Sequence, residues 1–181
     1  MYIEHLIYSA SLAVIVGMLF SRYYGRDPSW IIIAIAFVPD LDAATQGLRR
    51  FTRPLFPFVI YHGDFHNILL LIGFSLLFAM VLQRFGIRFT DGLICSAVGI
   101  AAHFIEDALV YNPAYAFLWP ITTRTFGIGI INETRNFFGI ANSTVLLIGI
   151  ILLAGALLLR TLIEGRGWWR VFLKGGKIQS S

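Results

Sequence analysis

The residues with the clearest chemical potential lie in the short run Tyr61–Asn67. This run holds two histidines, His62 and His66, with Asp64 between them. Residues four apart lie on one face of a helix, so a helix through this run would present both imidazoles to the same side. Imidazole and carboxylate ligands together suit zinc, manganese or iron. The run therefore predicts a transition-metal site, provided that further ligands converge on it.

Further acids and histidines interrupt apolar stretches elsewhere in the chain. Ionisable residues within membrane segments are energetically costly and are functional candidates by default. We expect the metal ligands to come from His66, His103, Asp107, Asp40, Asp42, His62 and His5, a set that suffices for one ion and allows two. His103 and Asp107 share a helix face at i and i+4. An acid that stays uncoordinated, Asp64 or Glu106, is the expected general base.

The composition identifies lipid as the solvent of this chain. Of its 181 residues, 57% are hydrophobic and only 13% are charged, whereas a soluble domain is about one quarter charged. This balance predicts an all-α integral membrane protein with residues 1–181 in a single transmembrane domain. The basic residues flank apolar runs, which is typical of topology signals and argues against a nucleic-acid partner.

Five apolar runs predict a bundle of about five transmembrane helices, at residues 2–20, 30–38, 62–83 (or from 67), 91–111 and 143–159. The second run is too short to cross a bilayer, because it stops at Pro39. It either continues as a helix toward Arg49 or breaks at Pro39 and re-enters. The long loop 112–142 is rich in aromatic residues and is expected to cover the site.

The distribution of basic residues predicts which side of the membrane carries the site. With five spans, five of the fourteen lysines and arginines fall on the side of the N-terminus and nine on the other. The positive-inside rule then places the N-terminus outside. The basic and aromatic tail, residues 160–181, becomes a cytoplasmic interfacial segment. All the candidate ligands fall on the outer side, although the topology was assigned without them.

The order of these motifs resembles a known family. The motifs are Pro39-Asp40-Leu41-Asp42, His62-Gly63-Asp64-Phe65-His66-Asn67, His103-Phe104-Ile105-Glu106-Asp107, Leu118-Trp119-Pro120 and Arg124-Thr125-Phe126-Gly127. Their order and spacing over residues 5–130 resemble the YdjM-type, LexA-binding, inner-membrane-bound proteins, described as predicted membrane-bound metal-dependent hydrolases. The resemblance implies hydrolysis at the inner membrane, whereas the ligand types alone imply only metal binding.

The chain departs from the pattern of that family at two positions. The pattern reads approximately His-Arg-Gly-x-x-His-Ser/Thr, so alignment on Gly63 and His66 places Tyr61 at the first histidine and His62 at the arginine. Either His62 replaces the usual metal ligand, or it contacts a metal ligand without binding the metal itself. The second departure is Asn67, which stands where the pattern has a small hydroxyl residue.

Three functions remain compatible with the residues. The first is a metal-dependent hydrolase that acts on a phosphate ester or other ester of a lipid or amphiphile through a metal-activated water, with Arg124 or Arg49 holding an anionic headgroup. The second is a proton- or ion-coupled transporter. Against it stand the lack of an inverted repeat and of polar residues continuing to the inner side. The third is a non-catalytic scaffold whose metal staples the helices together.

Overall fold

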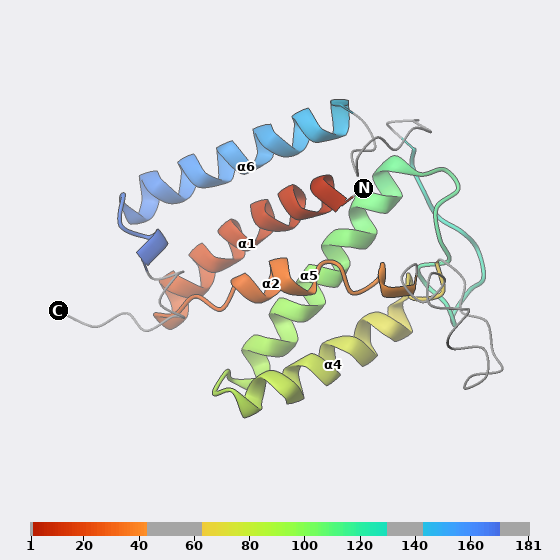
Figure 1. Cartoon of the computed structure of the whole chain (residues 1–181), viewed down its shortest axis with the longest axis horizontal. Helices are drawn as coiled ribbons and strands as arrows, with labels where there is room; N and C mark the ends of the chain where they lie inside the picture. The colour runs from red at the N-terminus through yellow and green to blue at the C-terminus, as the bar shows by residue number, and fades with distance from the viewer. Residues whose placement is uncertain (1, 43–62, 130–142, 171–181) are drawn as a thin grey trace, which may run out of the picture.

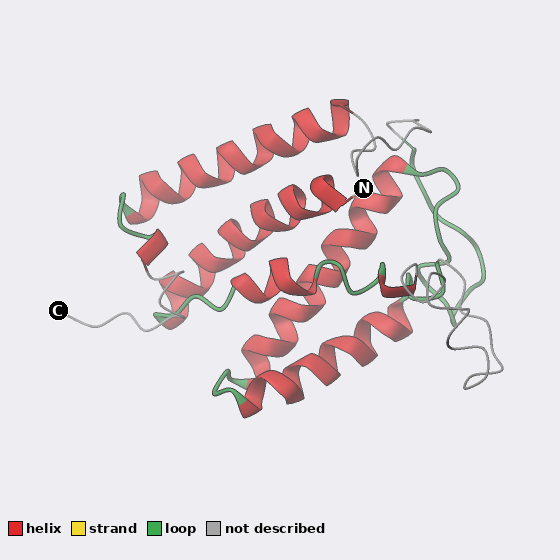
Figure 2. Ribbon diagram, viewed as in Figure 1, coloured by secondary structure: helices red, strands yellow, loops and turns green. Residues whose placement is uncertain are grey.

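The computed structural model describes residues 2–42, 63–129 and 143–170 (Figure 1). Every regular element in these ranges is a helix, and one isolated antiparallel bridge joins Tyr115 to Phe126 (Figure 2). The helices are α1 (Tyr2–Tyr24), α2 (Trp30–Ile35), α4 (Ile68–Arg84), α5 (Phe89–Val110) and α6 (Ser143–Glu164). The all-α membrane class is thus confirmed, and each helix overlaps the apolar run that predicted it.

Three of these helices, α1, α5 and α6, are long and apolar enough to cross a membrane. The fourth long element, α4, is apolar but has only 17 residues. In α6 the surface is mostly exposed leucine and isoleucine, as lipid-facing helices require. The expected number of five full spans is therefore reached only if α4 and the short second segment also cross the bilayer.

The second segment breaks where proline dictates. The α2 helix spans six residues, Trp30–Ile35, and the chain then turns through residues 36–40. A proline at position 39 has no N–H to donate, and its ring clashes with the carbonyl of residue 35. The helix ends at that residue. The break near Pro39 is observed, and the re-entry expected after it falls on residues outside those described.

Packing places α2 in the middle of the molecule. It lies against α1 and α5, while α1 also packs on α6 and α4 on α5. Gly99 permits the close approach of α2 to α5, because a Cβ atom there would lie 2.7 Å from the carbonyl oxygen of Ile32. The buried core around this contact includes Phe20, Ile31, Ile32 and Ile100. The packing of α2 on α5 in this buried core thus directs residues 36–42 toward the end of α5.

The two ends of the bundle have different polar chemistry. The beginning of α1, the beginning of α4 and the end of α5 lie at one end (Figure 1), and these segments, together with the turn before α4, carry His5, His66 and His103. At the opposite end the buried guanidinium of Arg160 donates to Asp27 at 2.7 Å. Arg26 donates to Asp91 at 2.9 Å, and this hydrogen-bonded carboxylate raises the pKa of Arg26 above its ordinary value. The second end is held together by ion pairs.

Candidate metal centre

Four side chains from three segments point their donor atoms at one small volume. The Nε2 atoms of His66 and His103 are 3.2 Å apart. The Oδ2 atom of Asp107 lies 3.3 Å from the first Nε2 and 3.4 Å from the second. The Oδ1 atom of Asp40 lies 3.9 Å and 3.7 Å from the same two nitrogens. The structure thus brings together three of the ligands expected from the sequence, with a second carboxylate, that of Asp40, beside them.

The distances fit a tetrahedral metal ion. An ion with ligands at about 2.0–2.1 Å separates neighbouring ligand atoms by about 3.3–3.4 Å. The triangle formed by His66, His103 and Asp107 has edges of 3.2, 3.3 and 3.4 Å. The distances from Asp40 Oδ1 to the two imidazole nitrogens are longer by several tenths of an ångström. Three ligands are therefore placed for one ion, and Asp40 stands near the fourth position.

Burial favours a cation at this point. The side chains of His66 and His103 are fully buried and that of Asp107 is 4% exposed. The Asp107 Oδ2 atom satisfies hydrogen-bond geometry with neither imidazole, and His103 Nδ1 has no hydrogen-bond partner. Burial lowers the pKa of His66, but the carboxylates of Asp107 and Asp42 outweigh burial and raise this pKa to about 9. The cluster therefore attracts positive charge, and the residues fit a divalent ion.

Asp42 lies behind His66. Its Oδ2 atom is 3.3 Å from Nδ1 of His66, the nitrogen that points away from the triangle. The same oxygen accepts backbone N–H groups of Gly63 at 2.8 Å and Phe65 at 3.2 Å. A carboxylate at the second nitrogen of a histidine fixes the ring and its tautomer. We expected Asp42 among the ligands, and the structure places it where it orients one.

The turn that carries His66 depends on Gly63. This glycine has φ +103°, a backbone conformation that residues with a side chain rarely adopt. A Cβ atom there would also lie 2.8 Å from the ring of Tyr115, whose ring centroid is 4.2 Å from that of His66. The turn is thus clamped between Asp42 on one side and Tyr115 on the other. His66 precedes α4, which begins at Ile68, so the later of the two expected starts of this helix is the closer one. His66 is therefore not on a helical face with His62.

Asn67 explains one departure from the sequence pattern. It is the N-cap of α4, and its Oδ1 atom accepts the backbone N–H of Leu70 at 3.0 Å. Its amide also donates to the carbonyl oxygen of Asp64 at 2.7 Å. Serine, threonine and asparagine are all good N-caps. Asn67 therefore caps the helix, a role that serine or threonine could also perform.

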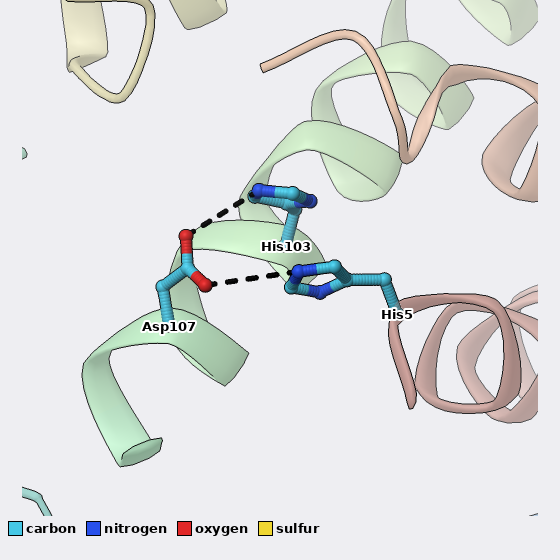
Figure 3. A group of neighbouring side chains, drawn as sticks. All are labelled: His5, His103 and Asp107. Carbon is cyan, nitrogen blue, oxygen red and sulfur yellow. Dashed lines mark ion pairs between the residues drawn. The ribbon is translucent and has the colours of Figure 1, made fainter. Parts of the chain in front are cut away.

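A second buried pair, His5 and Glu106, adjoins the triangle. His5 Nδ1 is 2.7 Å from Oε2 of Glu106. The other nitrogen of His5 faces Asp107 Oδ1 at 3.8 Å, whereas Oδ2 of Asp107 faces His103 (Figure 3) and also His66. The rings of His5 and His103 stack at a centroid distance of 4.0 Å. The Glu106 carboxylate thus holds a histidine in the same way that Asp42 does.

The remaining predicted site residues lie away from this arrangement or outside the described residues. Asp64 is exposed and lies on the wall of an adjoining cavity. Arg124 is exposed, and its backbone N–H donates to Oγ1 of Thr122. His62 and Arg49 lie outside the described residues, as do parts of the loop 112–142. Their roles stay predictions.

Sequence reasoning missed three residues. The ring of Tyr115 packs against His66 in a tilted arrangement, yet an aromatic residue in an aromatic loop carries no positional signal. Glu4 is fully buried beside His5 in the chain, and an acid within an apolar run was the signal for it. Arg160 was assigned to the inner interface, but it is buried with Asp27. The expectation that no polar residues continue to that side is therefore wrong, because pairing made this charge tolerable.

Comparison with known proteins gives one match. The family model of the YdjM inner membrane protein matches residues 1–173 of the chain. No curated protein and no solved structure matches the chain.

Proposed function

The chain belongs to the YdjM inner membrane protein family, and we propose that it is a metal-dependent hydrolase embedded in that membrane. One observation carries the proposal. Three donor atoms form a triangle of the size that a tetrahedral ion needs, and the carboxylate of Asp40 lies farther away, 3.7 and 3.9 Å from the two imidazole nitrogens. Catalytic zinc sites have three protein ligands and keep one position for water or substrate, whereas structural sites are closed by four.

The chain's own residues divide the work of hydrolysis among them. A divalent ion held by His66, His103 and Asp107 would activate water and polarise the ester oxygen. We assign the general base to Asp40, because its side chain is 15% exposed, the most exposed of the four, and within 4 Å of both imidazole nitrogens. Asp42 and Glu106 hold His66 and His5 in place. Zinc is the first choice for the ion, and manganese and iron are the alternatives.

The position of the cluster supports an amphiphilic substrate. It lies at the end of the bundle where α4 begins and α5 ends, so that it sits near one surface of the bilayer. The excess of basic residues at the other end makes that end cytoplasmic and this one external. An ester or phosphate ester at the polar boundary of a lipid would reach this depth. Arg124, exposed in the loop after α5, is a candidate for an anionic headgroup.

A metal-stapled scaffold is the second candidate. The short distances from Asp40 to the two imidazole nitrogens favour the scaffold, because Asp40 as a fourth protein ligand would close the site to water and substrate. A transporter finds less support, because the buried charges at the opposite end, Arg160 and Asp27, are paired with each other. The role of Asp40 therefore separates the hydrolase from the scaffold.

The test combines metal analysis with a substrate screen on the purified, full-length protein in lipid nanodiscs. The screen offers amphiphiles with phosphomonoester, phosphodiester and carboxylic ester bonds, before and after chelation and re-addition of zinc, manganese or iron. We expect bound metal, and turnover that chelation abolishes and one metal restores. A His103→Ala variant should lack both. Metal-loaded protein inactive on the whole panel would support the scaffold instead.

A further inference from the structure

An open cavity of about 390 Å³ adjoins the turn that carries His66. Its wall is formed by residues on both sides of that histidine and by the loop after α5. The lining residues are Gly63, Asp64, Phe65, Asn67, Leu70, Ala116 and Trp119. Pockets that bind small molecules have volumes of about 300–1,000 Å³. The cavity is therefore large enough for part of a ligand and too small for a whole membrane lipid.

The lining has a polar part and an apolar part. Asp64 and Asn67 are polar and stand at the turn before α4. Phe65, Leu70 and Trp119 are apolar, and Leu70 belongs to the first turn of α4 itself. The cavity therefore spans the junction between a polar loop and an apolar helix. A ligand with a polar head and a hydrocarbon chain matches this division.

The apolar part of the cavity is continuous with surface that lipid must cover. On α4, Leu69 and Ile72 are 46% and 50% exposed, next to the Leu70 wall. On the other side, Trp119 is 42% and Ile121 78% exposed in the loop after α5. Tryptophan is enriched at the boundary between bilayer and water. A chain in the outer leaflet can thus enter the cavity sideways, between the start of α4 and this loop.

We propose that this cavity is the binding subsite for the polar–apolar junction of a membrane amphiphile, with the first carbons of its hydrocarbon chain against Leu70 and Trp119. The proposal rests on the proposed hydrolase function for its purpose, but the binding itself needs no catalysis. Because Phe65 and Asn67 flank His66 in the chain, an amphiphile seated there lies against the same turn that carries this candidate ligand. The substrate class is then an amphiphile taken directly from the leaflet.

The experiment uses an ether-linked phospholipid that cannot be hydrolysed and carries a photoactivatable diazirine near the head end of one chain. The full-length protein in nanodiscs is illuminated, and the labelled peptides are mapped by mass spectrometry. We expect labels on residues 63–70 and 116–119. Leu70→Trp should fill the cavity and abolish this labelling, and Ala116→Trp should do the same from the opposite wall. Leu77→Trp, at an exposed position farther along α4, is the matched control and should leave it unchanged.

The outcomes separate the subsite from the reaction. Labelling that both filling variants abolish, in a protein that hydrolyses no substrate, would keep the subsite and overturn the hydrolase. Hydrolysis without labelling of these two segments would overturn the subsite alone. Labelling that is equal in Leu70→Trp, Ala116→Trp and Leu77→Trp would show contact with bulk lipid only and would also overturn the subsite.

Discussion

His66 and His103 face each other with their Nε2 atoms 3.2 Å apart, although 37 residues separate them in the chain. One precedes α4 and the other lies in the second half of α5. The contact is possible because the short turn after α4 folds the two helices into antiparallel neighbours. Two buried imidazoles and a carboxylate at this distance could hold a metal ion.

Removing the Asp107 carboxylate should abolish metal binding. Asp107 lies close to both other members of the triangle, and its Oδ2 atom has no hydrogen-bond partner among the described residues. We expect Asp107→Asn to weaken metal affinity by more than the roughly 10–100-fold that the loss of a supporting group causes. Elemental analysis of the purified protein measures this. Asp91→Asn, at the other end of the same helix, is the control and should retain the metal.

Asp40 should affect turnover without affecting metal content. Its carboxylate lies 3.7 Å and 3.9 Å from the two imidazole nitrogens, farther than Asp107. If it serves as the general base, Asp40→Asn should lower kcat by about 10²–10⁴-fold, the usual contribution of such a group. Metal stoichiometry should stay at the wild-type value. A variant that loses its metal would instead make Asp40 a fourth ligand and favour the scaffold.

Asp42 should set the affinity for the metal rather than the number of ions bound. It orients His66 through Nδ1 and accepts two backbone N–H groups of the same turn. Asp42→Asn should weaken metal binding by about 10–100-fold, as the loss of a supporting carboxylate does. A titration with a competing chelator measures this affinity. At saturating metal the stoichiometry should be normal, and a persistent deficit would place Asp42 among the direct ligands.

The buried ion pair at the opposite end should stabilise the fold without touching the chemistry. Arg160 is fully buried, donates to Asp27 and Glu164, and lies 4.4 Å above the ring of Trp168. Arg160→Met leaves Asp27 buried without its partner, which costs about 3–5 kcal/mol. The loss should appear as a lower midpoint of thermal unfolding in detergent, with metal content preserved.

A partly exposed pair provides the comparison for this prediction. Arg26 is 21% exposed and pairs with Asp91, so that Arg26→Met should destabilise the protein less than Arg160→Met. The double variant Arg160→Met/Asp27→Asn should recover part of the lost stability, because it removes the stranded charge as well. Equal midpoints for the two single variants would contradict the role assigned to burial.

Much of the architecture follows from local sequence features. Apolar runs predicted the helices because lipid requires every backbone polar group to bond within its own segment. Pro39 ended α2 through its missing N–H and its clash with residue 35, which are properties of the residue itself. The gathering of acids and histidines at one end also followed, since span count and loop charge assign each residue to a side.

Only the tertiary structure decided which atoms meet. Asp40 and Asp42 are two residues apart, yet one faces Nε2 of His66 and the other faces Nδ1. Asp107 joins the triangle while its neighbour Glu106 pairs with His5. These divisions depend on the rotation of α5 about its axis and on the depth at which the turn of His66 meets it. Hydrophobic pattern reports which side of a helix is buried, but partners from distant segments are set by packing, to which Gly63, Gly99 and Tyr115 contribute.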